Sequence, residues 1–220
     1  KYTSFYEARN PAKVYPSEFV VRTFLAKYPR LNMNLKGGAR VLDIGFGDGR
    51  NTCFLIEQGY ETYGIEITEG IVDLLYNRLK HAGMPATLKV GRNSQIPFDN
   101  AFFDIILACH ASYYVDEDES FDDNLAEIAR VMRRDAYFIT SLPDQNSYIF
   151  SDAKTLDNGH VKIQEDHDQN REGHKMRIFE DFADIENALS PHFKNFSFGS
   201  ARNNYYGIDE RVFWVVCQKK

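Results

Sequence analysis

The chain has 220 residues, of which 43% are hydrophobic, so it can bury a full core and lies at the upper size of a single domain. Its 32 acidic residues exceed its 26 basic ones, and the net charge of −6 argues against a broad nucleic-acid-binding surface. No apolar run approaches the roughly 20 residues of a membrane span, so we expect no membrane partner.

The three cysteines, Cys53, Cys109 and Cys217, lie far apart, each inside an apolar segment. This arrangement is typical of free, buried thiols in a reducing compartment, so we expect a cytoplasmic protein. We expect it to be a monomer or a homodimer. The chain begins at Lys1 rather than at a methionine, so residues can precede it in the natural protein.

The first predicted element is a helix over about 17–28. Ser17 suits an N-cap, and apolar residues then recur at the spacing of one helix face, at Val21, Phe24, Leu25 and Tyr28. We interpret residues 1–37 as an N-terminal cap segment that includes this helix.

A strand, a glycine turn and a helix come next. Residues 41–44 are a short apolar strand, and the helix after the glycines ends before Gly59. Residues 61–66 predict a second strand, after which Thr68 can cap a second helix.

Three further strands are predicted at 86–90, 103–109 and 136–141, with a helix between the last two. Residues 103–109 are nearly all apolar, as expected of a strand buried on both faces of a parallel sheet. Strands that alternate with helices predict an α/β fold with a doubly wound, Rossmann-like parallel sheet covered by helices on both faces.

Residues 143–178 break this alternation. They are polar and show no helical periodicity, which is typical of a lid, a binding loop or an inserted hairpin. Their histidines, His160, His167 and His174, are seven residues apart, unlike the short spacings of zinc sites, so we expect no metal. His160 and His174 remain candidates to reach a substrate.

The chain ends with a helix around Ile185 and two aromatic-rich segments at 195–199 and 212–217. Because only a loop joins these two segments, they must pair antiparallel.

The sequence RVLDIGFGDGRN at 40–51 places three glycines two residues apart, directly after a strand. Glycine tolerates positive φ, so the chain can turn sharply into the helix. The missing Cβ also lets a ligand lie against backbone N–H groups at the helix N-terminus. The alternative is that the glycines only pack the strand against the helix.

A dinucleotide-binding fingerprint would read GxGxxG with an acid about 20 residues on. Here the pattern is GxGxG, with Asp43 two residues before Gly45 and Glu66 21 residues after it. Glu66 ends the second predicted strand, where a carboxylate can accept hydrogen bonds from two ribose hydroxyls. We therefore predict a ligand with a free ribose and consider a dinucleotide less favoured.

With these features in place, the sequence resembles the class I S-adenosylmethionine-dependent methyltransferases of the small-molecule type. The resemblance runs from about residue 38 to the C-terminus and rests on the terminal antiparallel pair and four blocks, VLDIGFGDGRNT, YGIEIT, SQIPFDNAFFDIILACHASYY and LAEIARVMRRDAYFIT. It implies one domain with a seven-stranded sheet in the order 3-2-1-4-5-7-6, strand 7 antiparallel. It also implies methyl transfer from S-adenosylmethionine to an oxygen or nitrogen of a small-molecule acceptor.

The same resemblance implies a set of cofactor-binding residues: Asp43, Gly45, Phe46, Gly47, Glu66, Ile67, Asn93, Ser94 and His110. In that family Asp43 would lie near the cofactor's amino group, Glu66 would hold the ribose and Ile67 would pack on adenine. The family often has an acid before an LPF-like stretch, where this chain has Arg92, Asn93 and Ser94. The amide oxygen of Asn93 can take the place of that acid as an acceptor.

His110, Tyr113 and Tyr114 follow the fourth strand, and ligands in open α/β sheets bind beyond the carboxyl ends of the strands. His110 is the candidate catalytic base, because its ordinary pKa of about 6.5 leaves it largely neutral at pH 7. Alternatively, it only contacts the cofactor or a backbone carbonyl. Tyr113 and Tyr114 either line the substrate pocket or are packed aromatics.

Tyr6, Arg9 and Tyr15 precede the first helix and are further candidates for substrate contacts, because such segments in the family often close over the cofactor. Simple surface packing is the alternative for all three.

Two other functional classes remain open at this point. One is a nucleotide-dependent oxidoreductase on a related sheet, which the glycine spacing and the antiparallel ending oppose. The other is a protein that binds the cofactor with little or no turnover.

Overall fold

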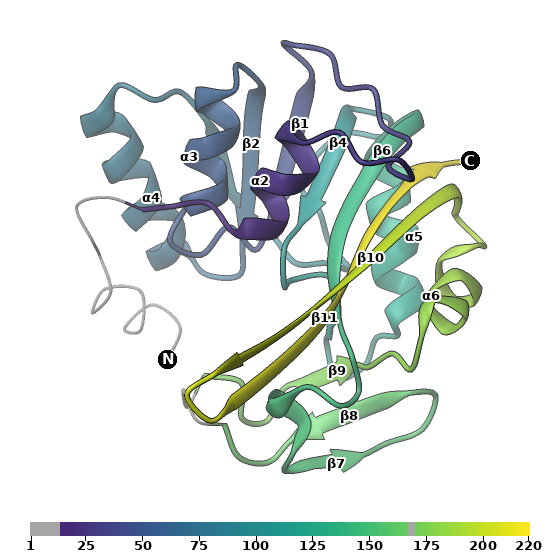
Figure 1. The fold of residues 1–220 in the computed structure, drawn as a ribbon. Coiled ribbons are helices and arrows are strands. Elements are labelled where there is room, and N and C mark those ends of the chain that lie inside the picture. Colours follow the sequence, from purple (N-terminus) through teal and green to yellow (C-terminus); the bar gives the residue numbers. More distant parts are fainter. Residues whose placement is uncertain (1–13, 167–169) are drawn as a thin grey trace.

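The structure is a computed structural model that describes residues 14–166 and 170–220. A seven-stranded sheet forms its centre, and a second, four-stranded sheet lies at the bottom of the molecule in the view of Figure 1. None of the helices in the described part of the chain has the length and apolar character that a membrane crossing requires.

The central sheet contains seven of the strands. In chain order they are β1 (Arg40–Ile44), β2 (Glu61–Glu66), β3 (Thr87–Val90), β4 (Phe103–Ala108), β6 (Met132–Pro143), β10 (Phe193–Tyr205) and β11 (Ile208–Lys219). They are arranged as β3-β2-β1-β4-β6-β11-β10, and β11 alone runs antiparallel to both of its neighbours. Numbered without the strands of the second sheet, this is the predicted order.

The described part of the chain contains five α-helices, which pack against the sheet. They are α2 (Glu18–Leu25), α3 (Arg50–Glu57), α4 (Glu69–Ala82), α5 (Phe121–Val131) and α6 (Phe182–Leu189). Helices α2 and α3 lie over one face, and α5 and α6 lie over the other (Figure 1). Thr68 caps α4 as predicted, since its hydroxyl accepts a hydrogen bond from the N–H of Ile71.

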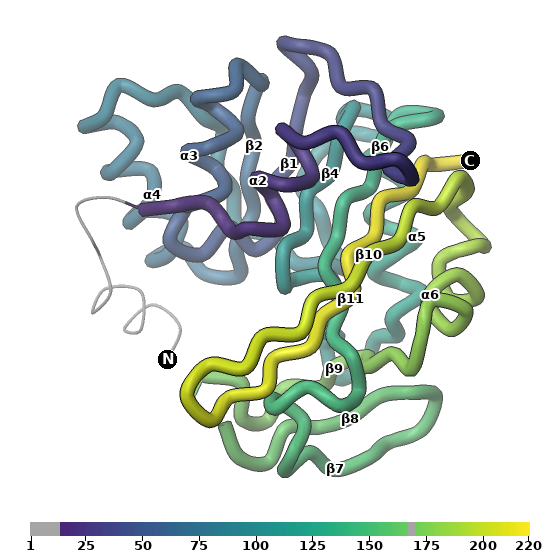
Figure 2. The backbone as a smooth tube through the Cα atoms, in the orientation of Figure 1, coloured from purple at the N-terminus to yellow at the C-terminus, as the bar shows by residue number. Residues whose placement is uncertain are grey.

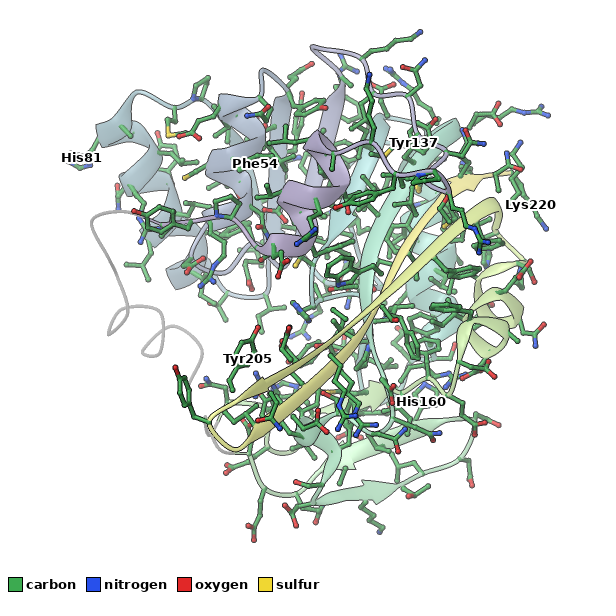
Figure 3. All side chains as sticks on the ribbon, in the orientation of Figure 1. Phe54, His81, Tyr137, His160, Tyr205 and Lys220 are labelled. Atoms are coloured by element: carbon green, nitrogen blue, oxygen red, sulfur yellow. The ribbon has the colours of Figure 1, made fainter. Side chains whose placement is uncertain are left out.

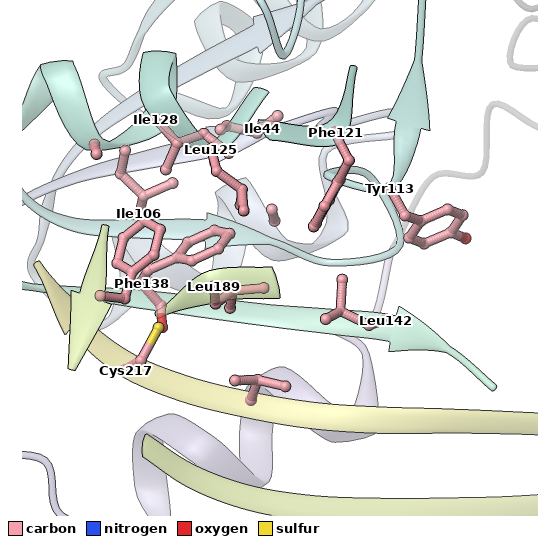
Figure 4. Close-up of a cluster of buried hydrophobic side chains, with 14 of the residues drawn as sticks. Ile44, Ile106, Tyr113, Phe121, Leu125, Ile128, Phe138, Leu142, Leu189 and Cys217 are labelled. Carbon is pink, nitrogen blue, oxygen red and sulfur yellow. The ribbon is translucent and has the colours of Figure 1, made fainter. Parts of the chain in front are cut away.

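The alternation of side chains along β4 shows why the strand is nearly all apolar, with Asp104 as the exception. Ile105 and Leu107 pack with α2 and α3, whereas Ile106 and Ala108 face the opposite cluster. In that cluster Ile106 and Phe138 meet Leu125 of α5 and Leu189 of α6 (Figure 4).

The first helix ends earlier than predicted. It stops at Leu25, and Ala26 already has extended backbone angles, whereas the apolar spacing predicted a helix to Tyr28. Tyr28 precedes Pro29, and a residue before proline is disfavoured in the helical region, so the pattern overestimated the helix.

The segment 143–178 contains most of the second sheet. A 3₁₀ turn, η1 (Tyr148–Phe150), is followed by three strands, β7 (Ala153–Thr155), β8 (His160–Ile163) and β9 (Lys175–Arg177). The fourth strand of the sheet, β5 (Tyr114–Val115), comes from the loop after β4. The order is β5-β9-β8-β7 with antiparallel pairing, so the segment is bound to the loop after β4 through β5. Figure 2 shows the path of the chain through β7, β8 and β9.

The β10–β11 hairpin is longer than predicted and continues past the central sheet. Its pairing with β6 ends at Val212–Pro143, but the two strands stay paired as far as Tyr205 and Ile208. The hairpin crosses the front of the molecule in Figure 1, and Tyr205 lies at its tip in Figure 3. This free half of the hairpin forms a wall for one of the cavities described next.

Candidate active site

Two adjoining cavities lie at the carboxyl ends of the parallel strands. The first has a volume of about 160 Å³ and is bordered by the ends of β1 and β2, the loop after β3 and the loop after β4. The second has a volume of about 300 Å³ and is bordered by the loop after β4, the segment 143–178 and β11. Gly45, His110 and Tyr114 line both.

The glycine turn is built for close packing as well as for a change of direction. Gly45, Gly47 and Gly49 all have positive φ, which other residues rarely adopt. A Cβ on Gly45 would come within 2.8 Å of the Cβ of Ala111, and one on Gly49 would overlap Leu75. Neighbouring protein therefore fills the space beside two of these glycines, in agreement with the packing interpretation of the motif, and Gly45 also lines both cavities.

Glu66 is a buried carboxylate aimed at the glycine turn. Its Oε1 accepts a hydrogen bond from the N–H of Gly47 at 3.1 Å, and its Oε2 accepts one from the N–H of Ile67 at 2.8 Å. Only 8% of Glu66 is exposed, and that surface borders the first cavity. Burial raises the pKa of Glu66, while the two backbone hydrogen bonds oppose the rise.

Asp43 lies behind the turn rather than in a cavity. It is 1% exposed, and its Oδ2 accepts a hydrogen bond from the hydroxyl of Thr52 at 2.7 Å. Burial raises the pKa of Asp43 to about 7, with Thr52 acting against the shift and the nearby Glu66 adding to it. Asp43 lines neither cavity.

Asn93 joins the loop after β3 to the loop after β4. Its amide nitrogen donates to the carbonyl oxygens of Ala111 and Tyr114, both at 2.9 Å. Asn93 lines the first cavity, and its amide oxygen is not used in these two hydrogen bonds. Asp116 also lines this cavity and forms an ion pair with Arg92 at 2.7 Å.

His110 is held in an uncommon backbone conformation. Its φ of 55° lies in the left-handed region, and its N–H donates to the hydroxyl of Ser141 at 2.8 Å. The side chain has accessible surface because it borders both cavities, but surrounding protein still desolvates it and lowers its pKa. Glu210 raises that pKa, and Arg171 and Arg50 lower it further.

Cys109 lines the second cavity as a protonated thiol. Burial raises the pKa of Cys109 to about 11, and hydrogen bonds from neighbouring groups, such as the Ser141 hydroxyl, oppose the rise. A thiol with such a pKa is a poor nucleophile near neutral pH, which argues against covalent catalysis by this residue.

The structure brings together most of the predicted site residues. Those that line the first cavity are Gly45, Glu66, Ile67, Asn93, His110 and Tyr114, while Tyr113 lines the second. Those that line neither cavity are Asp43, Phe46, Gly47, Ser94, Tyr15 and His160. Phe46 packs with Ile71 and Leu75 under α4. Tyr6 and Arg9 lie outside the described residues.

Several cavity residues escaped the sequence interpretation. They are Asp116 in the first cavity and Arg50, Tyr148, Arg171, Glu210 and Arg211 in the second, together with His174, which lines the first cavity and was only a loose candidate. His174 packs edge-on against Tyr114, with the ring centres 5.6 Å apart. No local pattern marks Arg171, Glu210 and Arg211, because they reach the cavity through the segment 143–178 and the terminal hairpin. Arg50 instead directly follows the glycine turn at the start of α3, so its place next to the motif could have indicated it.

Comparison with known proteins agrees with this geometry. Residues 42–140 match the family model described as a methyltransferase domain. An uncharacterized methyltransferase of Mycobacterium bovis is 32% identical over 95 residues, which is 43% of this chain and 35% of the relative. The match thus spans about a third of that relative's length.

Solved structures share the fold at low sequence identity. A protein from Methanosarcina mazei described as a SAM-dependent methyltransferase has a TM-score of 0.66 at 20% identity, covering 89% of this chain and 99% of that one. A 1,6-didemethyltoxoflavin-N1-methyltransferase from Burkholderia thailandensis, solved with 1,6-didemethyltoxoflavin and S-adenosylhomocysteine, has a TM-score of 0.61 at 19% identity, covering 84% and 72%. The Rossmann-like fold of these proteins is therefore the fold of this chain.

Proposed function

We propose, from the match of residues 42–140 to the methyltransferase domain model, that the protein transfers a methyl group from S-adenosylmethionine to an oxygen or nitrogen of a small molecule. The observation that carries the proposal is the meeting of two cavities at Gly45, His110 and Tyr114. A methyl donor in one cavity and an acceptor in the other would have their reacting atoms at this junction.

The first cavity suits the nucleoside part of the cofactor. A carboxylate offers about four acceptor positions, and backbone N–H groups occupy one on each oxygen of Glu66. The ribose hydroxyls can donate to the others. A buried carboxylate in this position fits a ligand with two adjacent hydroxyl groups.

The other side of the first cavity suits adenine. Ile65 and Ile67 supply apolar surface for the faces of the ring, and Asn93 and Asp116 supply acceptor oxygens for its amino group. Asp116 thereby provides an acid where the loop after β3 has none.

His110 is the residue we assign to proton removal. When bound, S-adenosylmethionine supplies a methyl group activated by its positive sulfur. The protein has to align the acceptor and take its proton, which a neutral imidazole at the junction of the cavities can do. The lowered pKa keeps His110 neutral at pH 7.

The second cavity is the acceptor site in this proposal. Its volume of about 300 Å³ suits a small molecule, and the segment 143–178 contributes Ser147, Tyr148 and Arg171 to its wall. We therefore assign this segment the role of a lid. The Burkholderia thailandensis neighbour, which holds 1,6-didemethyltoxoflavin together with S-adenosylhomocysteine, supports a small-molecule acceptor on this fold.

Calorimetric titration with S-adenosylmethionine and S-adenosylhomocysteine tests the cofactor assignment. We expect micromolar binding by the wild-type protein and at least a tenfold loss for Glu66→Ala, because its carboxylate can no longer accept the ribose hydroxyls. Glu69→Ala is the matched control, since Glu69 is exposed in the first turn of α4 and lines neither cavity.

Absence of binding by the wild-type protein would contradict the proposed function. Cofactor binding without product from any acceptor would instead favour a binding protein with no turnover.

A further inference from the structure

Among the described residues that line the second cavity are three arginines and only one acidic residue. Arg50 comes from the start of α3, Arg171 from the segment before β9 and Arg211 from β11, and the carboxylate is that of Glu210. The side chains that line this cavity are thus more often basic than acidic, whereas the whole chain has a net charge of −6. Positive charge concentrated in a concave site attracts anionic ligands.

Each of these arginines is oriented by an aspartate that does not line the cavity. Arg171 pairs with Asp166 at 2.7 Å, and Arg211 pairs with Asp209 at 2.8 Å. Arg50 likewise pairs with Asp48. These ion pairs offset part of the positive charge and hold the guanidinium groups in fixed positions, so the arginines form a preorganised lining.

The Arg171–Asp166 pair shows how firmly one of these charges is held. The side chain of Asp166 is 2% exposed, and its Oδ2 also accepts the N–H groups of Asn170 and Arg171. Burial by itself lowers the pKa of Arg171, but neighbouring tyrosines and Asp166 raise it more, so the guanidinium stays charged.

The rest of the lining is aromatic and apolar. Tyr113, Tyr114 and Tyr148 contribute rings, and Ile149 and Val212 contribute aliphatic surface. Rings and aliphatic groups of this kind suit a carbon skeleton, while arginine pairs with carboxylate and phosphate groups through two parallel hydrogen bonds.

We propose that the methyl acceptor is a small anionic molecule whose carboxylate or phosphate group is bound by the arginines of the second cavity. The inference rests on the proposed function and adds the substrate class. Arg171 and Arg211 line only the second cavity, whereas His110 lines both. The anionic group therefore binds away from the junction, and the methylated oxygen or nitrogen lies next to His110.

Calorimetric titration of the protein saturated with S-adenosylhomocysteine tests this inference, with benzoate and inorganic phosphate as separate probes. We expect saturable binding of at least one probe, which weakens as the salt concentration rises. Comparing the two probes shows whether the site takes a carboxylate or a phosphate.

The discriminating variant is Arg211→Gln, for which we expect at least a tenfold loss of probe affinity. Arg202→Gln is the matched control, because Arg202 also pairs with Asp209, at 2.9 Å, but lines neither cavity. Binding of S-adenosylhomocysteine by each variant checks that it is folded.

Two results separate the failure of this inference from that of the proposed function. If S-adenosylhomocysteine binds but neither probe does, or if Arg211→Gln binds the probes like the wild type, the anionic acceptor is refuted and the methyltransferase proposal stands. If S-adenosylhomocysteine itself does not bind, the proposed function fails, and this inference fails with it.

Discussion

His110 borders both cavities and carries a side chain that can accept a proton from a ligand in either of them. Its left-handed backbone and the hydrogen bond from its N–H to Ser141 set the direction of the imidazole. Desolvation lowers its pKa, so the ring keeps its capacity to accept a proton at mildly acidic pH.

We expect His110→Asn to lower kcat for methyl transfer about 100-fold, because a positioned base contributes roughly that much or more. Asparagine tolerates positive φ, so the loop should keep its conformation. In the wild type, activity should fall only below the ordinary histidine pKa of about 6.5, as the imidazole becomes protonated. The activity of the variant should not show this fall at acidic pH.

His81→Asn serves as the control, because His81 lies exposed on α4 (Figure 3). Unchanged kcat in His110→Asn, measured as S-adenosylhomocysteine released, would mean that solvent takes the proton and that His110 only positions ligands.

Asp43 gives a prediction that needs no acceptor. Unfolded, it loses its proton near pH 3.9, but folded it does so at about pH 7. Between these values the folded state binds more protons than the unfolded state, so this group makes the free energy of unfolding fall as the pH rises. Above pH 7 the buried carboxylate is charged, and the full free-energy cost of burying that charge lowers the stability of the folded state.

We expect Asp43→Asn to remove this pH dependence. The stability difference between variant and wild type should grow in the variant's favour from pH 4 to 7 and level off above pH 8, by an amount on the order of 4 kcal/mol. Denaturant unfolding at several pH values measures it, with exposed Asp118→Asn as the control. A difference that does not change with pH would contradict the raised pKa.

At the level of elements, the loop after β4 is fixed from several directions. Asn93 and Asn124 donate to its backbone carbonyls, Ser141 accepts the N–H of His110, and the hydroxyls of Ser112 and Thr140 are 2.8 Å apart. The loop separates the two cavities, so these bonds preserve the junction on which the proposed chemistry depends.

Asn124→Ala should therefore destabilise the protein by about 1–3 kcal/mol, because it leaves the buried carbonyl of Ser112 without its donor. The carbonyl oxygen of Tyr114 still accepts a hydrogen bond from Asn93, which limits the loss of stability. Asn187→Ala, on the exposed face of α6, corrects for the gain in helix propensity. Equal denaturation midpoints for the two variants would show that Asn124 does not stabilise the loop.

At the level of the whole molecule, the second cavity joins parts of the chain that are far apart in sequence. The start of α3, the loop after β4, the 143–178 segment and β11 all contribute to its wall. The free half of the β10–β11 hairpin meets η1 in the segment 143–178, because the hairpin continues beyond the end of β6 (Figure 1). The overall acidic charge therefore gives no indication of the arginine lining inside.

The sequence by itself determined the strands of the central sheet, the presence of helices between them and part of the first cavity, while the strand order came from the family resemblance. Burial between helices makes β1 and β4 apolar, and the repeating pattern of helices is visible in any window of a dozen residues. Glu66 was found because the end of β2 lies at a regular distance from the glycine turn. These features depend on residues close together along the chain.

Only the tertiary structure decided how the cavities are completed. The strands of the second sheet are two to four residues long, too short to show a period, and their pairing with β5 brings His174 beside Tyr114. Arg171 and Arg211 face the same cavity because of strand pairing over long separations in sequence. Such proximity is a property of the folded chain, since no local pattern encodes which distant segments meet.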